Sequence, residues 1–174
     1  MSTATATTIA GTMLQELEQE AATTRRLLER VPDSRTSWRP HEKSWTLGEL
    51  AMHIAMVPGG VAEFVARPSP VQAPEFPTPP AAPNTAELLR RFDESIAKAR
   101  TVLSGMDDEA AMEMWRMVNG GRDVMAMPRA AFMRAIMLNH WYHHRGQLLV
   151  YLRLLDQSVP SVYGPTADEN PFAA

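Results

Sequence analysis

Three histidines fall within five positions near the C-terminal end of the chain, in the segment LNHWYHHRGQLLVYLRLL (138–155). Apolar residues repeat at helical spacing through this segment, so an amphipathic helix is expected. At about 100° per residue, His140 and His144 lie about 40° apart on such a helix. Two imidazoles four residues apart on one face can chelate a divalent ion, as they do in helical zinc sites.

The residues beside this pair are expected to have other roles. Helical projection places His143 about 90° from the centre of the apolar stripe, where it flanks the pair or faces solvent. A proton-shuttle role is the alternative for His143. Gln147 lies on the stripe and is a candidate for orienting a ligand or binding water. Arg145 projects about 100° away from His144 and is expected to form a salt bridge.

A pair of core histidines, each hydrogen-bonded to a neighbour, explains the same spacing without a metal. A buried polar group without a partner is costly, so each ring would need a partner of its own. The residues alone leave the metal site and the satisfied core pair as open interpretations.

A catalytic metal usually has three protein ligands and one open position. The remaining histidines are His41, in a loop beside Pro40, and His53, in an expected helix. Periodicity places His53 on the flank of that helix and does not select it as an inward ligand. Glu49, one turn earlier, either fixes the tautomer of His53 or caps the helix, and the cap is the preferred role.

The composition excludes several classes of protein. The 174 residues include no cysteine, so disulfides and thiolate metal sites are excluded and any metal must use nitrogen and oxygen ligands. A formal net charge of −3 with scattered Lys and Arg argues against a nucleic-acid partner. No window approaches the roughly 18–20 apolar residues of a membrane span, and the N-terminus does not look like a Sec signal. We therefore expect a cytoplasmic protein with no membrane partner.

Four helices are expected to position the histidines, in one domain over residues 1–174. Residues 1–12 are small and polar and are expected to be disordered. The first helix follows and ends at Pro32.

The second helix carries His53. The capping box Thr46-Leu-Gly-Glu49 opens it, and Pro58-Gly-Gly is expected to stop it at about Val57. An apolar patch at 61–66 extends or resumes the helix. The following residues, 67–83, are rich in proline and are expected to form an extended connector.

Two further helices complete the pattern. One covers residues 84–103, and the other runs from Pro128 to Leu155. The sequence between them is consistent with a short hairpin that turns at Val118–Arg122. Gly146, inside the last helix, costs about 1 kcal/mol relative to Ala, which a close helix–helix contact would explain.

Four helices with one long crossover give a four-helix bundle as the simplest architecture. The twelve methionines are expected to fill the core flexibly and not to bind metal. Trp38, Trp45 and Trp141 could line a cleft, although tryptophans at helix joints are mostly core residues.

Three segments of the chain resemble the DinB-like family, within the DinB/YfiT-like superfamily. They are SWTLGELAMHIA (44–55), the histidine segment (138–155) and VPSVYGPTADENPF (159–172). The resemblance covers nearly the whole chain, from ELEQEAATTRRLLERVPD to the end. It implies an all-α four-helix bundle in up-up-down-down order that is often dimeric, so a homodimer is expected.

The resemblance also implies a divalent metal, nickel or zinc, held by three histidines. One lies in the segment SW-T-L-G-E-L-x-x-H, which places it at His53. Two lie in H-x-x-x-H-R-G-Q, which places them at His140 and His144. All three family positions are histidine in this sequence.

Some members of the superfamily look like enzymes that join or isomerise electrophilic small molecules with a thiol such as bacillithiol or mycothiol. The resemblance therefore implies a metal-dependent thiol S-transferase with a low-molecular-weight thiol as a cofactor, and it assigns no catalytic residue beyond the ligands. The alternatives are a hydrolase-like metalloenzyme, a non-catalytic metal-binding protein and a metal-free, stress-response interaction domain.

Overall fold

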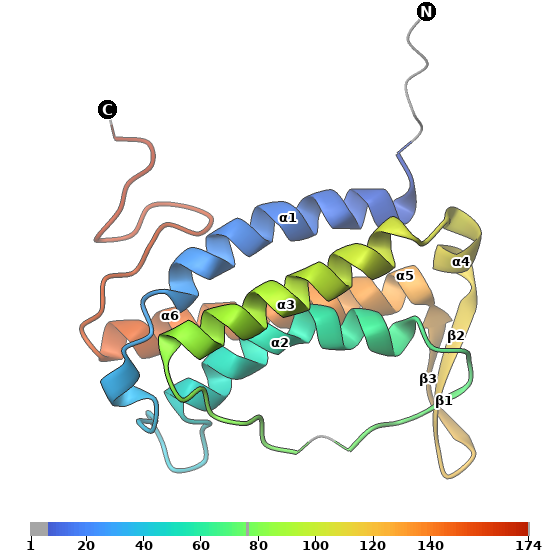
Figure 1. Cartoon of the computed structure of the whole chain (residues 1–174), viewed down its shortest axis with the longest axis horizontal. Helices are drawn as coiled ribbons and strands as arrows, with labels where there is room; N and C mark the ends of the chain where they lie inside the picture. The colour runs from blue at the N-terminus through green and yellow to red at the C-terminus, as the bar shows by residue number, and fades with distance from the viewer. Residues whose placement is uncertain (1–6, 76, 174) are drawn as a thin grey trace, which may run out of the picture.

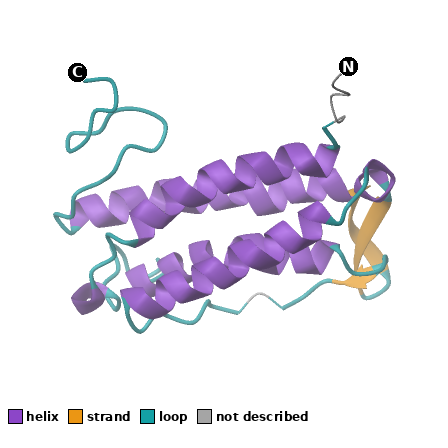
Figure 2. Cartoon of the chain, turned by 45° about the horizontal axis from the view of Figure 1, so that its top comes forward, coloured by secondary structure: helices purple, strands orange, loops and turns teal. Residues whose placement is uncertain are grey.

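The computed structural model describes residues 7–75 and 77–173 and is mostly helical. Its long helical segments lie side by side (Figure 1), and a small sheet lies at one end of them (Figure 2). The expectation of an all-α chain is therefore corrected to a mostly helical chain with one mixed sheet of three strands. Within the described ranges, no helix combines the length and apolarity needed to cross a membrane.

The directions of the long segments differ from the up-up-down-down order. The chain runs one way through α1 (Ile9–Leu28) and α6 (His140–Leu154), and the opposite way through α2 (Leu47–Val65) and α3 (Thr85–Ser104), as the colours of Figure 1 show. The connection between α2 and α3 passes back along the helices, so these two helices can run parallel. This connection is the expected long crossover.

The first helix, α1, begins earlier than expected. Thr8 caps it, because the hydroxyl of Thr8 accepts a hydrogen bond from the Gly11 amide (3.0 Å). Residues 9–12 are therefore helical, which corrects the expected disorder over residues 1–12. The part of that expectation that concerns residues 1–6 lies outside the described residues.

The second helix, α2, begins with the expected capping box. The Glu49 amide donates to the Thr46 hydroxyl (3.2 Å), and the Thr46 amide donates to the Glu49 carboxylate (2.7 Å). The expectation that Pro58-Gly-Gly ends this helix is wrong, because α2 continues through Pro58 to Val65.

Gly59 explains how closely α2 and α3 pack. Its amide donates to the Ser95 hydroxyl of α3 (2.8 Å), and that hydroxyl donates to the Met56 carbonyl (3.2 Å). A Cβ atom at Gly59 would lie 2.6 Å from the Ser95 carbonyl oxygen, so only glycine allows this approach.

The sheet joins the proline-rich connector to the predicted hairpin. Strand β1 (Val71–Gln72) comes from the connector and pairs in parallel with β2 (Met114–Asn119). Strand β2 pairs antiparallel with β3 (Arg122–Pro128), and Gly120 and Gly121 adopt positive φ angles at the turn. The short helix α4 (Asp108–Met112) precedes this hairpin.

The last helical run is not a uniform α-helix. It consists of α5 (Arg129–Phe132), a π-helical stretch η2 (Met133–Asn139) and α6. The explanation expected for Gly146 is wrong, because a Cβ atom there would meet nothing within 4 Å. The fully buried row of α6 is Trp141, Arg145, Leu148 and Leu152.

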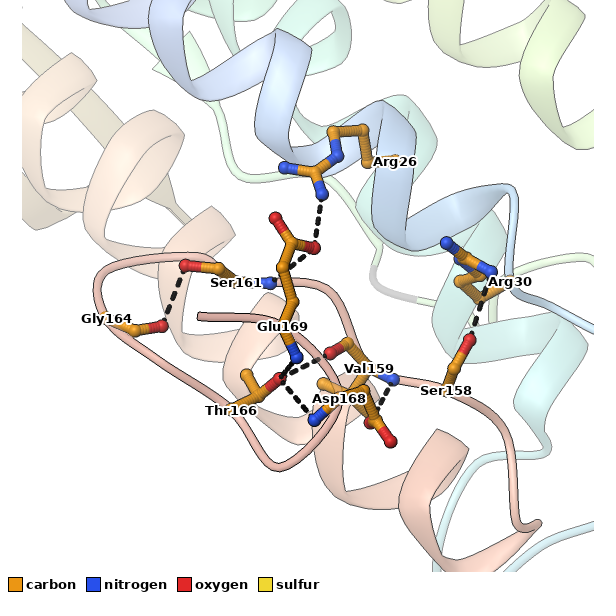
Figure 3. A network of polar contacts seen from close by, with 9 residues as sticks. All are labelled: Arg26, Arg30, Ser158, Val159, Ser161, Gly164, Thr166, Asp168 and Glu169. Atoms are coloured by element: carbon orange, nitrogen blue, oxygen red, sulfur yellow. Dashed lines mark hydrogen bonds and ion pairs between the residues drawn. The ribbon is translucent and has the colours of Figure 1, made fainter. Parts of the chain in front are cut away.

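The C-terminal segment folds back as a loop against α1 and α6 (Figure 3). Asp168 accepts a hydrogen bond from the Val159 amide (2.8 Å) and pairs with Arg153 of α6. Glu169 pairs with Arg26 of α1 and accepts from the Ser161 amide (3.2 Å). These contacts fix the tail on the side of α6 that carries Arg145.

Candidate metal centre

The structure brings together the three histidines that the resemblance implicates. His53 comes from α2, and His140 and His144 come from consecutive turns of α6. The Nε2 atom of His140 lies 2.8 Å from Nε2 of His144 and 3.5 Å from Nε2 of His53. In the described part of the chain, this is the one histidine and carboxylate cluster whose ligand atoms all lie within 4.8 Å of one another.

A buried hydrogen bond sets the register between the two helices that carry these rings. The residue after His140 is Trp141, and the residue after His53 is Ile54. The indole N–H of Trp141 donates to the Ile54 carbonyl (2.9 Å). That carbonyl is available because Pro58, four residues later, has no amide N–H to donate to it. The proline thus allows α6 to bond α2 next to the histidines.

The site keeps the rings neutral. Burial, with further repulsion from His144 and His140, lowers the pKa of His53 from 6.5 to about 4. Burial also lowers the pKa values of His140 and His144. Only a neutral imidazole can donate a lone pair to a metal, so the three rings are ready to bind an ion near pH 7 with little proton release. Such a donor set fits zinc, nickel and other divalent ions that favour imidazole.

His140 follows the π-helical stretch directly, and π-helical turns are frequent at functional sites. Its amide donates to the Ala135 carbonyl instead of the Ile136 carbonyl, which an α-helix would use. A hydrogen bond with the Ile136 carbonyl opposes the effect of burial on the pKa of His140, but the pKa remains lowered. No side chain of the described residues bonds the buried Nδ1 atom of His140.

His144 is held on its outer side by Gln147. The His144 Nδ1 atom lies 2.8 Å from the Gln147 side-chain oxygen. The Gln147 amide nitrogen lies 3.1 Å from Nε2 of His143. His143 is exposed, as the helical projection predicted, but it contacts the site through Gln147.

Tryptophan forms one wall of the centre. The Trp45 ring lies 4.9 Å from the His53 ring and stacks on His144 at 5.5 Å and 25°. Tyr151 of α6 holds this wall, because its hydroxyl donates to the Trp45 carbonyl (3.2 Å) and its ring meets the edge of Trp38. Trp45 therefore lines the site, whereas Trp141 is a core residue.

Two sequence candidates lie outside the cluster. His41 is exposed in its loop, and its Nδ1 atom accepts a hydrogen bond from the Lys43 amide (3.2 Å). Glu49 caps α2, which was the preferred of its two predicted roles.

Arg145 forms the expected salt bridge, but it does so in the core. Its side chain is 1% exposed and pairs with Glu20 of α1 at 2.5 Å. It also donates to Thr24 (3.0 Å) and to the hydroxyl of Tyr163 in the C-terminal segment (2.5 Å). Sequence reasoning missed these partners, although a charged residue within an apolar row of α6 was the available signal.

A cavity of about 530 Å³ lies between α6 and the C-terminal segment. Arg145, Gly146, Leu149 and Tyr163 are among the residues that line it, and none of the three clustered histidines does. The cavity is thus separate from the metal centre.

The chain is similar to known proteins in sequence and in fold. A model of the DinB family matches residues 1–171. The uncharacterized protein YrdA of Bacillus subtilis (strain 168) is 25% identical over 156 residues, which cover 90% of this chain and 89% of the relative.

Solved structures show the same likeness. A DinB-like protein from Bacillus cereus ATCC 10987 matches with a TM-score of 0.71 at 25% identity, over 90% of this chain and 99% of that one. The DinB-like protein YjoA from Bacillus subtilis matches with a TM-score of 0.63 over 84% of this chain and 93% of that one. Its identity is 20%, so that likeness concerns the fold alone.

Proposed function

The chain belongs to the DinB family, and we propose that it is a metal-dependent thiol S-transferase that acts on electrophilic small molecules. His53, His140 and His144 hold a divalent ion, nickel or zinc, and leave a further position open. The observation that carries the proposal is the convergence of three ring nitrogens from two helices within 4.8 Å.

When bound, the ion supplies Lewis acidity and lowers the pKa of a thiol or water in the open position. The chain contains no cysteine, so the thiol comes from a low-molecular-weight cofactor. The thiol releases its proton to solvent, and its sulfur forms a bond to an electrophilic carbon of the substrate while that carbon's bond to a leaving group breaks and the leaving group departs with the electron pair. The three imidazoles supply neutral donors, and Trp45 limits access from one side.

Metal content tests the three-ligand assignment. We expect about one equivalent of nickel or zinc in untagged wild-type protein and a large loss in His53→Ala, as measured by elemental analysis. His41→Ala is the matched control, because His41 is an exposed histidine outside the cluster. Equal metal content in wild type and His53→Ala would exclude the assignment.

Activity tests the reaction class. Metal-loaded wild type should conjugate a low-molecular-weight thiol, such as bacillithiol or mycothiol, to electrophiles. His140→Ala should lose most of that rate, and an unchanged rate would exclude the proposal.

A non-catalytic role is the second candidate, because an ion at this centre would join α2 to α6 across 87 residues of sequence. Chelation would then remove much of the stability of the fold, whereas a catalytic centre would lose activity with a smaller change in stability.

A homodimer in the cytoplasm is also part of the proposal. The dimer rests on the family resemblance, and the location rests on the composition of the chain. Light scattering after size exclusion should give twice the chain mass of 19.3 kDa, and a monomer mass would contradict it.

A further inference from the structure

On the outer side of His144, two hydrogen bonds within α6 join His144 to Gln147 and Gln147 to His143. His143, His144 and Gln147 are neighbours on this helix, since Gln147 follows His144 by three residues and His143 by four. The carbonyl end of the Gln147 amide meets Nδ1 of His144 at 2.8 Å, and its nitrogen end meets Nε2 of His143 at 3.1 Å.

The chemistry of imidazole determines which nitrogen of His144 carries the proton. A neutral ring carries one N–H, and the nitrogen that binds a metal must be the one without it. The Nε2 atom of His144 lies 2.8 Å from Nε2 of His140 and faces the cluster. Nδ1 must therefore carry the proton and needs an acceptor, which the Gln147 oxygen provides.

His143 fixes the other end of the amide. With its oxygen toward His144, Gln147 presents its N–H groups to the lone pair on Nε2 of His143. An exposed glutamine side chain rotates freely unless both ends are engaged. His143 thus holds Gln147 in the orientation that His144 needs.

We propose that Gln147 is a positioning residue for the metal centre, that it sets the tautomer of His144, and that His143 anchors it. This inference rests on the proposed metal-binding function. It assigns roles to two residues that do not touch the ion, since partners of this kind orient a ligand ring and raise its basicity.

The expected effect is modest, because Gln147 is exposed and water can partly replace it. We expect Gln147→Leu to bind Zn²⁺ about tenfold more weakly, at the low end of such effects. Gln147→Glu keeps an acceptor toward His144 and should retain wild-type affinity or exceed it. Gln15→Leu, at an exposed glutamine of α1, controls for adding an apolar residue to a helix surface.

Affinity is measured by competition between the metal-free protein and a chromophoric chelator for Zn²⁺, with His144→Ala as the reference for a lost ligand. The Co²⁺ absorption spectrum supplies a second readout, which should change in Gln147→Leu and return in Gln147→Glu. The thermal midpoint of the metal-free Gln147→Leu protein should match that of Gln15→Leu, so that a folding defect is separated from a ligand effect.

Three results would overturn the proposal. Gln147→Leu could bind Zn²⁺ as tightly as wild type, or the leucine and glutamate variants could be weakened equally, and either result contradicts the acceptor role. If wild type and His144→Ala bind Zn²⁺ equally, the proposed metal centre itself fails and this inference fails with it.

Discussion

His53, His140 and His144 are kept neutral because each is half-buried. The lowered pKa of each ring has burial as its largest cause, and for His53 the neighbouring rings add to it. The same property that prepares them for a metal makes them costly to protonate. Acid should therefore act on the fold as well as on the site.

We expect the metal-free protein to lose stability as the pH falls from about 6.5 to 4. The unfolded chain takes up a proton at His53 near pH 6.5, whereas the folded chain does so only near its pKa of about 4. Within that window the unfolded state binds more protons, so the stabilisation is complete above pH 6.5 and declines below it. His53→Gln should lose about 1–2 kcal/mol less than wild type between pH 7 and pH 4.5 in urea unfolding. Parallel pH curves for the two proteins would contradict this.

The residues alone predicted that His140 and His144 form a pair, but they did not identify the third histidine of the site. Helix geometry placed His140 and His144 on one face and His143 to the side, because positions within one helix follow from its period. The choice of His53 came from the family resemblance, since packing between helices is a long-range property. The contact between Gln147 and His143 depends on side-chain rotamers, which periodicity does not determine.

Beside the centre, a proline leaves one carbonyl of α2 free to accept a hydrogen bond from α6. Pro58 lies inside α2 with both of its neighbours buried, and Trp141 supplies the hydrogen bond that the proline cannot. The hydrogen bond that Pro58 removes from α2 is thus replaced by one from α6. The same hydrogen bond fixes the position of α6 along the axis of α2.

Trp141→Phe should destabilise the protein and weaken metal binding. It leaves the buried Ile54 carbonyl without its partner, which costs about 1–3 kcal/mol in addition to the lost volume. In a Pro58→Ala background the helix can supply an amide N–H to that carbonyl, so the same substitution should cost about 1–2 kcal/mol less. A double-mutant cycle of unfolding free energies measures the difference, and additive costs would rule out this role for the indole.

Two glycines should respond to alanine in opposite directions. Gly146→Ala should raise the free energy of unfolding by up to about 1 kcal/mol, because the new methyl group meets open space and alanine favours helix. Gly59→Ala should lower it, because the methyl group would collide with the Ser95 carbonyl. Urea unfolding of both variants checks the pair, and a stabilising Gly59→Ala would contradict the close packing of α2 and α3.

Local signals predicted most element boundaries. The Thr46 capping box, the hairpin turn and the extended connector are confirmed, since each depends on residues next to one another. The stop at Pro58 was wrong because its rescue comes from Trp141, 83 positions later in the sequence. The π-helical stretch and the helix directions likewise depend on packing that no local pattern encodes.

Across the whole molecule, the centre joins parts of the chain that lie far apart in sequence. His53 and His140 are 87 residues apart, and the connector, α3 and the sheet lie between them. The unfolded chain cannot present the three rings together, so an ion that binds them should favour the folded state.

We expect Zn²⁺ to raise the thermal midpoint of the metal-free protein. At a free concentration 100 times the dissociation constant, the gain is about 2.7 kcal/mol, or roughly 5–10 °C for a chain of this length. Differential scanning calorimetry of wild type and His140→Ala measures it. An equal shift in the variant would place the stabilising ion elsewhere.

The stacking of Trp45 on the histidines has an optical consequence. Its indole ring lies within 5.5 Å of the His53 and His144 rings, so a bound paramagnetic ion such as Ni²⁺ or Cu²⁺ would quench its fluorescence strongly. Trp141 follows a proposed ligand but is wholly buried on the core side, and Trp115 lies in β2 of the sheet. The difference in quenching between wild type and Trp45→Phe would therefore isolate the signal of the centre. The protein carries an intrinsic, label-free probe of its own occupancy.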